Sequence, residues 1–256
     1  MSNLTNIGFD IRSKEALMSL AEMATNVGRA MPCDLGTYFL YEEVSGAQLY
    51  CQVNDRRQLI GVNPHFTGES RRHVCLTSTV ERKDSPLDGA YHGWANPPKL
   101  DDPQGGEYPF VFDVPDFRLM GEIVFPKSYQ IQLTAFASLD FHIFDDEAAF
   151  DASGVFGEVK LASSSFIPSG LFTKSPAPPA QATLSGIIKA CSEKVNQFSN
   201  TAFWWFLVDT LGGEIDVVAD KLLIKRSPKV GDILFGAFWL SGRLISPMSK
   251  PNDYHP

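Results

Sequence analysis

Two side chains that can bind a metal, His73 and Cys75, lie two residues apart in a stretch typical of a β-strand. Alternation along a strand places both on one face. Cys51 and His65 add further sulfur and nitrogen ligands of the kind that Zn²⁺ prefers. A structural zinc site needs several such ligands to converge, and this spacing does not force them together. We therefore predict no metal site.

Three consecutive carboxylates, Asp145, Asp146 and Glu147, are the densest acidic group of the chain. Consecutive residues on a helix do not share a face, so they do not predict a general acid–base pair. The run is typical of a solvated helix start, where carboxylates lie at the positive end of the helix dipole. It also remains a candidate contact for a basic partner.

The sequence motifs of several large enzyme classes are absent. There is no GxGxxG, no P-loop, no HExxH and no GxSxG in the chain. The three serines 163–165 lie in a predicted loop without a neighbouring histidine. We therefore predict a protein that is not an enzyme and needs no cofactor.

A cluster of aromatic side chains lies in a predicted strand at residues 201–210. Alternation puts Trp204 and Phe206 on one face, and Phe203 and Trp205 on the other. Barrels of the OB type stack the bases of single-stranded nucleic acids on such rings. Because this strand carries no Lys or Arg, we expect one face to pack against the N-terminal part, and we expect no nucleic-acid binding.

The charge of the chain also argues against nucleic-acid binding. The 256 residues include 22 Lys and Arg against 30 Asp and Glu, a formal net charge of -8. Such a protein repels polyanions on average and attracts basic partners. The N-terminus lacks a basic stretch followed by an apolar one, and no apolar run is long enough to span a membrane. We expect a cytoplasmic protein with four reduced thiols and no membrane contact.

Periodicity predicts the elements that must position these residues. Residues 13–27 have helical spacing of apolar side chains, with Ser13 as a possible cap and Gly28 as a stop. Residues 83–106 are rich in Pro, Gly and Asp and predict a long irregular loop that carries Trp94. Further strands are predicted at 108–114 and 130–144.

The C-terminal part predicts a small barrel. Strands at 184–193, 201–210, 214–219 and 233–245, with a Gly-Gly turn at 212–213, suggest an antiparallel barrel of the OB type over about 183–247. The predicted fold class is α+β, mostly antiparallel β. The predicted organisation is a helix-on-sheet domain over 1–104, a β-rich domain over 105–247 that contains the OB-like barrel, and a tail over 248–256.

Three strings in this C-terminal half carry a resemblance. They are SFIPSGLF at 165–172, GGEIDVVAD at 212–220 and FWLSG at 238–242. In these strings, and over about 121–245, the chain resembles a family of uncharacterised bacterial proteins. The resemblance implies a small, soluble, intracellular protein, and it brings no activity or catalytic residue with it.

Together these features favour a protein-binding module that is not an enzyme. We expect an immunity-type protein that neutralises a bacterial toxin, because acidic inhibitors of basic proteins combine charge steering with a few aromatic anchors. The alternative is an OB-like barrel that binds a small ligand or a single-stranded nucleic acid. The residues expected to contact a basic protein partner are Asp145, Asp146, Glu147, Glu214, Asp216 and Trp94.

Overall fold

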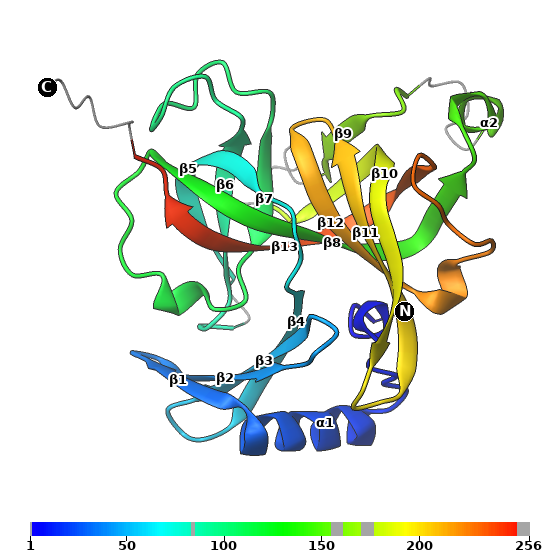
Figure 1. Cartoon of the computed structure of the whole chain (residues 1–256). Helices are drawn as coiled ribbons and strands as arrows, with labels where there is room; N and C mark the ends of the chain where they lie inside the picture. The colour runs from blue at the N-terminus through cyan, green and yellow to red at the C-terminus, as the bar shows by residue number, and fades with distance from the viewer. Residues whose placement is uncertain (1, 83–84, 155–160, 170–176, 250–256) are drawn as a thin grey trace, which may run out of the picture.

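The computed structural model describes residues 2–82, 85–154, 161–169 and 177–249 (Figure 1). Within these ranges the fold is α+β and mostly antiparallel β, as predicted, with two sheets. The helices are η1 (Thr5–Ile7), α1 (Lys14–Val27), η2 (Phe117–Leu119), α2 (Glu147–Ala152) and η4 (Lys221–Leu223). The strands are β1 (Arg29–Cys33), β2 (Gly36–Glu42), β3 (Ala47–Asn54), β4 (Leu59–Phe66), β5 (Arg72–Glu81), β6 (Gly89–Ala95), β7 (Pro109–Asp113), β8 (Lys127–Phe144), β9 (Ser165–Pro168), β10 (Gln181–Asn196), β11 (Thr201–Thr210), β12 (Gly213–Asp220) and β13 (Ile233–Pro247).

Helix α1 confirms the predicted N-terminal helix. The hydroxyl of Ser13 accepts a hydrogen bond from the backbone N–H of Ala16 at 3.1 Å, which satisfies one of the unpaired donors of the first turn. Leu20 and Ala24 are buried on the face turned to the smaller sheet. That sheet is an antiparallel meander in the order β1-β2-β3-β4, and α1 lies along it in Figure 1.

The larger sheet has nine strands, and its pairings close on themselves twice. One ring of pairings runs β5-β6-β7-β13-β8 and returns to β5. The second runs β10-β11-β12-β8-β13 and returns to β10. Both rings share the antiparallel pair β8–β13, which is built from two of the longest strands of the fold.

The two rings repeat one topology. Each half of the sheet is an antiparallel three-stranded meander, β5-β6-β7 or β10-β11-β12, followed later in the chain by a long strand, β8 or β13. The third strand of each meander runs parallel to the long strand of the other half: β7 to β13, and β12 to β8. The first strand of each meander is antiparallel to the long strand of its own half.

The middle of the sheet carries a row of four polar residues in register. Asp113 pairs with Ser241, Ser241 pairs with Thr134, and Thr134 pairs with Asp216. Paired residues of neighbouring strands point to the same face. The two aspartates therefore occupy equivalent places in the two halves of the repeated topology, and both point to one side of the sheet.

The pairings alter two predictions about the chain's organisation. Strands β5 and β6 precede residue 104 and yet pair within the larger sheet, so hydrogen bonds cross the predicted boundary between the domains. The region 83–106 was predicted to be an irregular loop, and this is wrong because β6 runs through it. Its Gly93 signals close packing, since a Cβ there would lie 2.6 Å from Val74 Cγ1.

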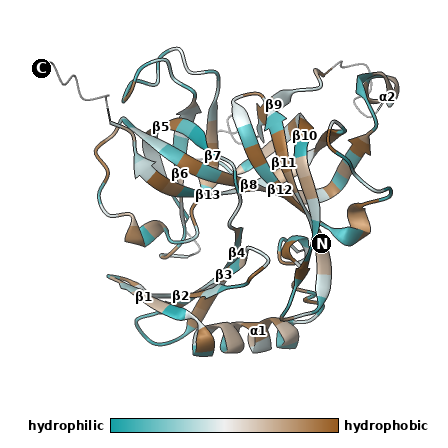
Figure 2. Cartoon of the chain, viewed as in Figure 1, coloured by the Kyte–Doolittle hydropathy of each residue, from teal (hydrophilic) through white to brown (hydrophobic). Residues whose placement is uncertain are grey.

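The apolar core has two main parts. Figure 2 shows hydrophobic and hydrophilic residues alternating along many of the strands, as expected of sheets with two different faces. Phe203 and Trp205 belong to the cluster between the two sheets that also contains α1, whereas Phe206 and Trp204 pack inside the larger sheet. This confirms that one face of β11 packs against the N-terminal part. No helix among the described residues is long and apolar enough to cross a membrane.

Candidate functional site

A polar cavity of about 250 Å³ lies where β4 of the smaller sheet approaches the larger sheet. Its walls contain both charged and hydrogen-bonding side chains, which is the usual make-up of a binding site. It is lined by Asn63, Arg82, Asp88, Gly89, Asp113, Val114, Pro115, Trp239 and Ser241. Below it is called the junction cavity.

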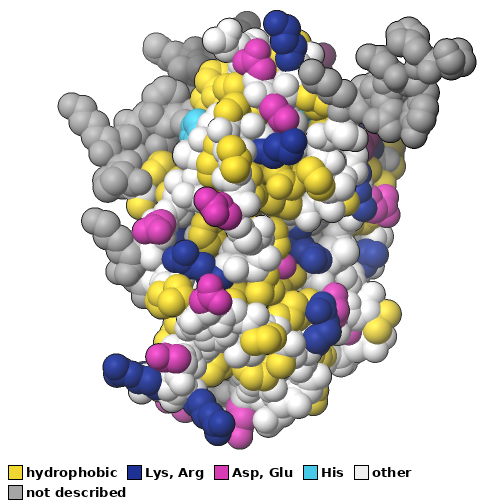
Figure 3. Space-filling view, turned by 90° about the vertical axis from the view of Figure 1, so that its left-hand side faces the viewer, with side chains coloured by type: hydrophobic (Ala, Val, Ile, Leu, Met, Phe, Trp, Pro, Cys, Tyr) yellow, Lys and Arg dark blue, Asp and Glu magenta, His cyan; other side chains and the backbone are white. Residues whose placement is uncertain are grey.

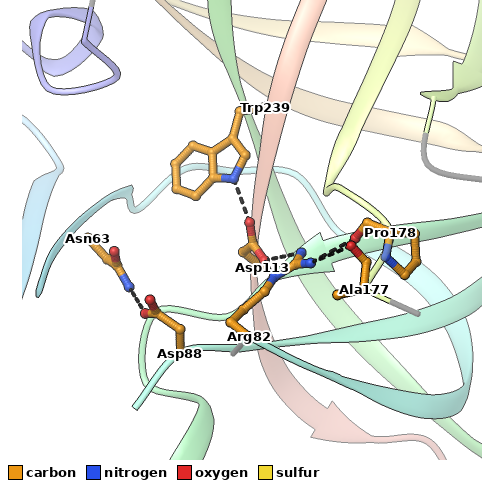
Figure 4. Close-up of polar contacts among 7 residues, drawn as sticks. All are labelled: Asn63, Arg82, Asp88, Asp113, Ala177, Pro178 and Trp239. Atoms are coloured by element: carbon orange, nitrogen blue, oxygen red, sulfur yellow. Dashed lines mark hydrogen bonds and ion pairs between the residues drawn. The ribbon is translucent and has the colours of Figure 1, made fainter. Parts of the chain in front are cut away.

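Asp113 is the most highly connected acid of the junction cavity (Figure 4). Its Oδ1 accepts from Nη2 of Arg82 at 2.6 Å and from Nε of Arg82 at 3.0 Å. Its Oδ2 accepts from the indole Nε1 of Trp239 at 2.6 Å. Arg82 is itself held by the carbonyl of Pro178, at 2.8 Å from Nη1. The orientation of this carboxylate is therefore fixed by two side chains.

Burial raises the pKa of Asp113, and the charge of Asp88 adds to the rise. The ion pair with Arg82 and the hydrogen bond from Trp239 act in the opposite direction. The side chains of Asp113 and Arg82 are 25% and 20% exposed, so the pair lies at the cavity wall and not deep in the core. The net effect on Asp113 is a raised pKa, with burial as its main cause.

Asp88 is anchored through one oxygen only. Its Oδ1 accepts from Nδ2 of Asn63 and from Nε2 of Gln52, both at 2.6 Å. Gln52 is fixed in turn, because its Oε1 accepts from Ser85 Oγ at 3.1 Å. Among the described residues, Oδ2 of Asp88 has no hydrogen-bond partner. Because Asp88 lines the junction cavity, this oxygen is free to accept a hydrogen bond from a bound group.

Ser241 is the end of a buried chain of hydrogen bonds. Nε2 of Gln132 contacts Oδ2 of Asp216 at 2.8 Å, and Oε1 of Gln132 contacts Nε2 of His65 at 2.9 Å. Nδ1 of His65 contacts Oγ of Ser241 at 2.8 Å. Burial lowers the pKa of His65 to about 3, so the imidazole is neutral at pH 7.

Asp216 was expected to contact a partner, and that prediction is wrong because its side chain is fully buried. It accepts four hydrogen bonds, from the backbone N–H groups of Glu69 and Ser70, from Trp205 Nε1 and from Gln132 Nε2. Burial of an unpaired carboxylate is costly, and four donors offset that cost. Asp216 therefore holds the 68–70 segment onto the sheet.

The other predicted contact residues belong to different elements of the fold. Asp145, Asp146 and Glu147 are exposed at the start of α2, yet each already has a partner within the protein. Asp145 pairs with Arg226 Nη1 at 3.2 Å, Asp146 caps α2, and Glu147 accepts from Ser163 Oγ at 3.0 Å. Glu214 is half-buried on β12, remote in sequence from that helix.

Trp94 was expected in an irregular loop, and its position on β6 corrects this. It pairs with Cys75 on β5 and with Pro109 on β7, and it is half-buried. The strand therefore holds its backbone, and the ring is less free to serve as an anchor than a loop residue is.

The metal candidates of the sequence do not combine. Among the residues that the structure describes, no group of three or more His, Cys, Asp or Glu side chains is arranged to hold a metal ion. His65 instead uses both ring nitrogens inside the protein, and Cys51 and Cys75 are free and buried. The absence of a metal site stays a prediction for the chain as a whole.

Sequence reasoning missed the residues of the junction cavity. Asp88 comes from the region predicted to be a loop, and Arg82 directly precedes that region. Asp113 and Trp239 come from strands more than a hundred residues apart. One signal was present in the sequence. Asp113 is the charged residue at the end of an otherwise apolar strand, PFVFD, and this position marks it as a candidate site residue.

Comparison with known proteins finds no matching family model, no matching curated protein and no matching solved structure.

Proposed function

We propose that this protein is a binding module that is not an enzyme, and that the junction cavity is its recognition site. The observation that carries the proposal is that the polar groups of the cavity are already held in place. Arg82 and Trp239 orient Asp113, while Gln52 and Asn63 orient Asp88. Groups fixed in this way lose little entropy on binding, which favours affinity.

The scaffold supports the same proposal. Five strands, β8 and β10–β13, form a ring of pairings in which the single parallel contact is β12–β8. This arrangement favours an OB-like barrel over the C-terminal half, with its fifth strand drawn from β8 and not from 183–247. Folds of this type use a rigid barrel to present a binding face.

The partner favoured by charge is a basic protein. The net charge of -8 attracts such a partner over a distance, and an immunity-type protein against a basic toxin fits that charge. Figure 3 shows acidic and basic side chains interspersed on the face that it displays. Because neither sign dominates that face, the contact is better assigned to a defined cavity than to a broad acidic surface. A basic partner would insert a side chain there.

The test closes the cavity and measures binding. Asn63 lies at the cavity wall on β4 and is half-buried, so Asn63→Phe places a ring across the space. A panel of small polar compounds and basic peptides is screened by thermal shift against the full chain. A ligand at 100 times its Kd stabilises the folded state by about 3 kcal/mol, which raises Tm by roughly 5–10 °C at this size.

Ligands that stabilise the wild type and not Asn63→Phe support the proposal. Gln58→Phe, at an exposed position outside the cavity, is the matched control and should keep the shifts. Shifts that persist in Asn63→Phe would place the binding elsewhere. The immunity type is tested by co-expression with the neighbouring gene: a toxic neighbour should be neutralised by the wild type and not by Asn63→Phe.

A further inference from the structure

We propose that the junction cavity selects a cation with several N–H donors, that is, an alkylammonium or a guanidinium group. The inference rests on the proposed function and adds the chemical class of the occupant. It follows from three independent features of the described residues: the charges of the cavity, the orientation of its hydrogen-bonding groups, and the way in which the chain satisfies the equivalent carboxylate, Asp216.

The charges leave the cavity negative. Among the described residues, its lining contains two carboxylates, Asp88 and Asp113, and one cation, Arg82. Arg82 donates to Asp113 through two nitrogens and to the carbonyl of Pro178 through the third. Asp88 has no cationic partner among the described residues. A bound cation would balance it, and the ring of Trp239 in the same wall would add a favourable cation–π contact.

Two groups of the wall present acceptors. Oδ2 of Asp88 has no partner among the described residues, while its Oδ1 is used by Gln52 and Asn63. The amide of Asn63 donates through Nδ2 to that carboxylate, so its Oδ1 is also left as an acceptor. In Figure 4 this oxygen points away from Asp88.

The buried chain of hydrogen bonds makes Ser241 a third acceptor. A carboxylate only accepts, so Asp216 fixes the amide nitrogen of Gln132 toward itself and its oxygen toward His65. Nε2 of His65 must then carry the proton, and Nδ1 must accept from the hydroxyl of Ser241. The hydroxyl hydrogen is thereby used, and Ser241 offers only lone pairs to the cavity that it lines.

The chain itself shows how a carboxylate at this position is completed. Asp113 and Asp216 are equivalent in the repeated topology, and each accepts from an indole, that of Trp239 or Trp205. Asp216 receives four N–H donors, two of them from the backbone of the 68–70 segment. Asp113 receives three, and the cavity lies open beside it. The missing donor is the one that a bound cation would supply.

Two sources can present such a group: a free amine, or a Lys or Arg side chain of a basic protein. The experiment titrates the full chain by calorimetry with butylguanidinium and butylammonium. N-butylurea, which matches butylguanidinium in shape without charge, and butyrate, an anion of similar length, are the comparisons. The tripeptide Gly-Lys-Gly and its norleucine counterpart form the second arm.

The decisive variant is Asp88→Asn. The new side chain can keep its oxygen on Gln52 and Asn63, and it then turns an amide donor toward the cavity in place of an acceptor. Asp209→Asn removes the same charge at an exposed position outside the cavity and is the matched control.

We expect butylguanidinium to bind the wild type at least tenfold more tightly than N-butylurea. Asp88→Asn should weaken the binding of the cations at least tenfold, whereas Asp209→Asn should change it less than twofold. Tighter binding of Gly-Lys-Gly than of butylammonium identifies a protein side chain as the source; the reverse identifies a free amine. If N-butylurea or butyrate binds as tightly as the cations, and Asn63→Phe abolishes it, the cation preference is overturned while the cavity stands as a binding site. If no probe binds, both proposals fall.

Discussion

Acid should destabilise this protein through one buried side chain, His65. Its imidazole is fully buried and hydrogen-bonded on both nitrogens, and its pKa is lowered from 6.5 to about 3. In the unfolded chain the same imidazole takes up a proton near pH 6.5, whereas the folded state takes none until about pH 3. Between these values the unfolded state binds more protons, so stability is lost as the pH falls.

The size of the effect follows from the shift. Each pH unit below 6.5 removes about 1.4 kcal/mol, so acidification from pH 8 to pH 5 should cost about 2 kcal/mol through His65 alone. The assay is urea unfolding at several values between these two, with the free energy of unfolding compared across pH. The variant His65→Gln lacks the titrating group. It should be less stable at pH 8, yet it should lose about 2 kcal/mol less on acidification.

The control replaces a histidine that is not fully buried. His142 lies in β8 next to the exposed Asp140, so His142→Gln shows the effect of replacing a histidine outside the core. Partial burial also lowers the pKa values of His73 and His92, and their contribution is common to wild type and variant, so it cancels in the difference. Equal slopes for wild type and His65→Gln would refute the reasoning, because they would mean that His65 is protonated in the folded state.

Two further outcomes are expected. Gly68→Ala would bring a Cβ within 2.1 Å of Asp216 Cγ, so it should lower the free energy of unfolding in urea by about 3 kcal/mol or more. The control Gly121→Ala, whose Cβ would meet no atom within 4 Å, should lower it by only about 1 kcal/mol, because of its left-handed backbone. A similar loss in both variants would mean that Asp216 does not hold the 68–70 segment. Cys51 is fully buried and its pKa is raised to about 12, so iodoacetamide at pH 8 should modify it only after unfolding. The half-buried Cys33 should react in the native state. Mass spectrometry after partial labelling distinguishes the two thiols, and early modification of Cys51 would contradict its burial.

The elements with a clear local signal were predictable from sequence. Helix α1 has apolar spacing, a capping serine and a terminal glycine. Strand β11 has the predicted bounds, Thr201–Thr210, because its run of four aromatic residues favours a strand. Strand β6 was missed because it contains Gly89 and Gly93, and a glycine-rich composition is typical of a loop. In the structure these glycines allow close packing against Phe117 and Val74.

The junction cavity could not be predicted in the same way. Its residues meet only because β13 runs beside β7 and because the smaller sheet is placed against that junction, and both facts depend on pairings between distant segments. The choice of Asp216 as a contact failed for a related reason. A residue on a strand points to one of two faces, and only the 68–70 segment, far away in sequence, covers the face to which Asp216 points.

The shared pair β8–β13 also makes the two halves of the larger sheet depend on each other. A unit made of one meander and its own long strand, such as β5 to β8, cannot close a ring, because it lacks the parallel neighbour that the other unit provides. Two units close both rings because their long strands pair with each other, and each long strand also pairs with the third strand of the other unit. The larger sheet thus has the strand connections of two equivalent units fused into one chain, with Asp113 and Asp216 at equivalent positions.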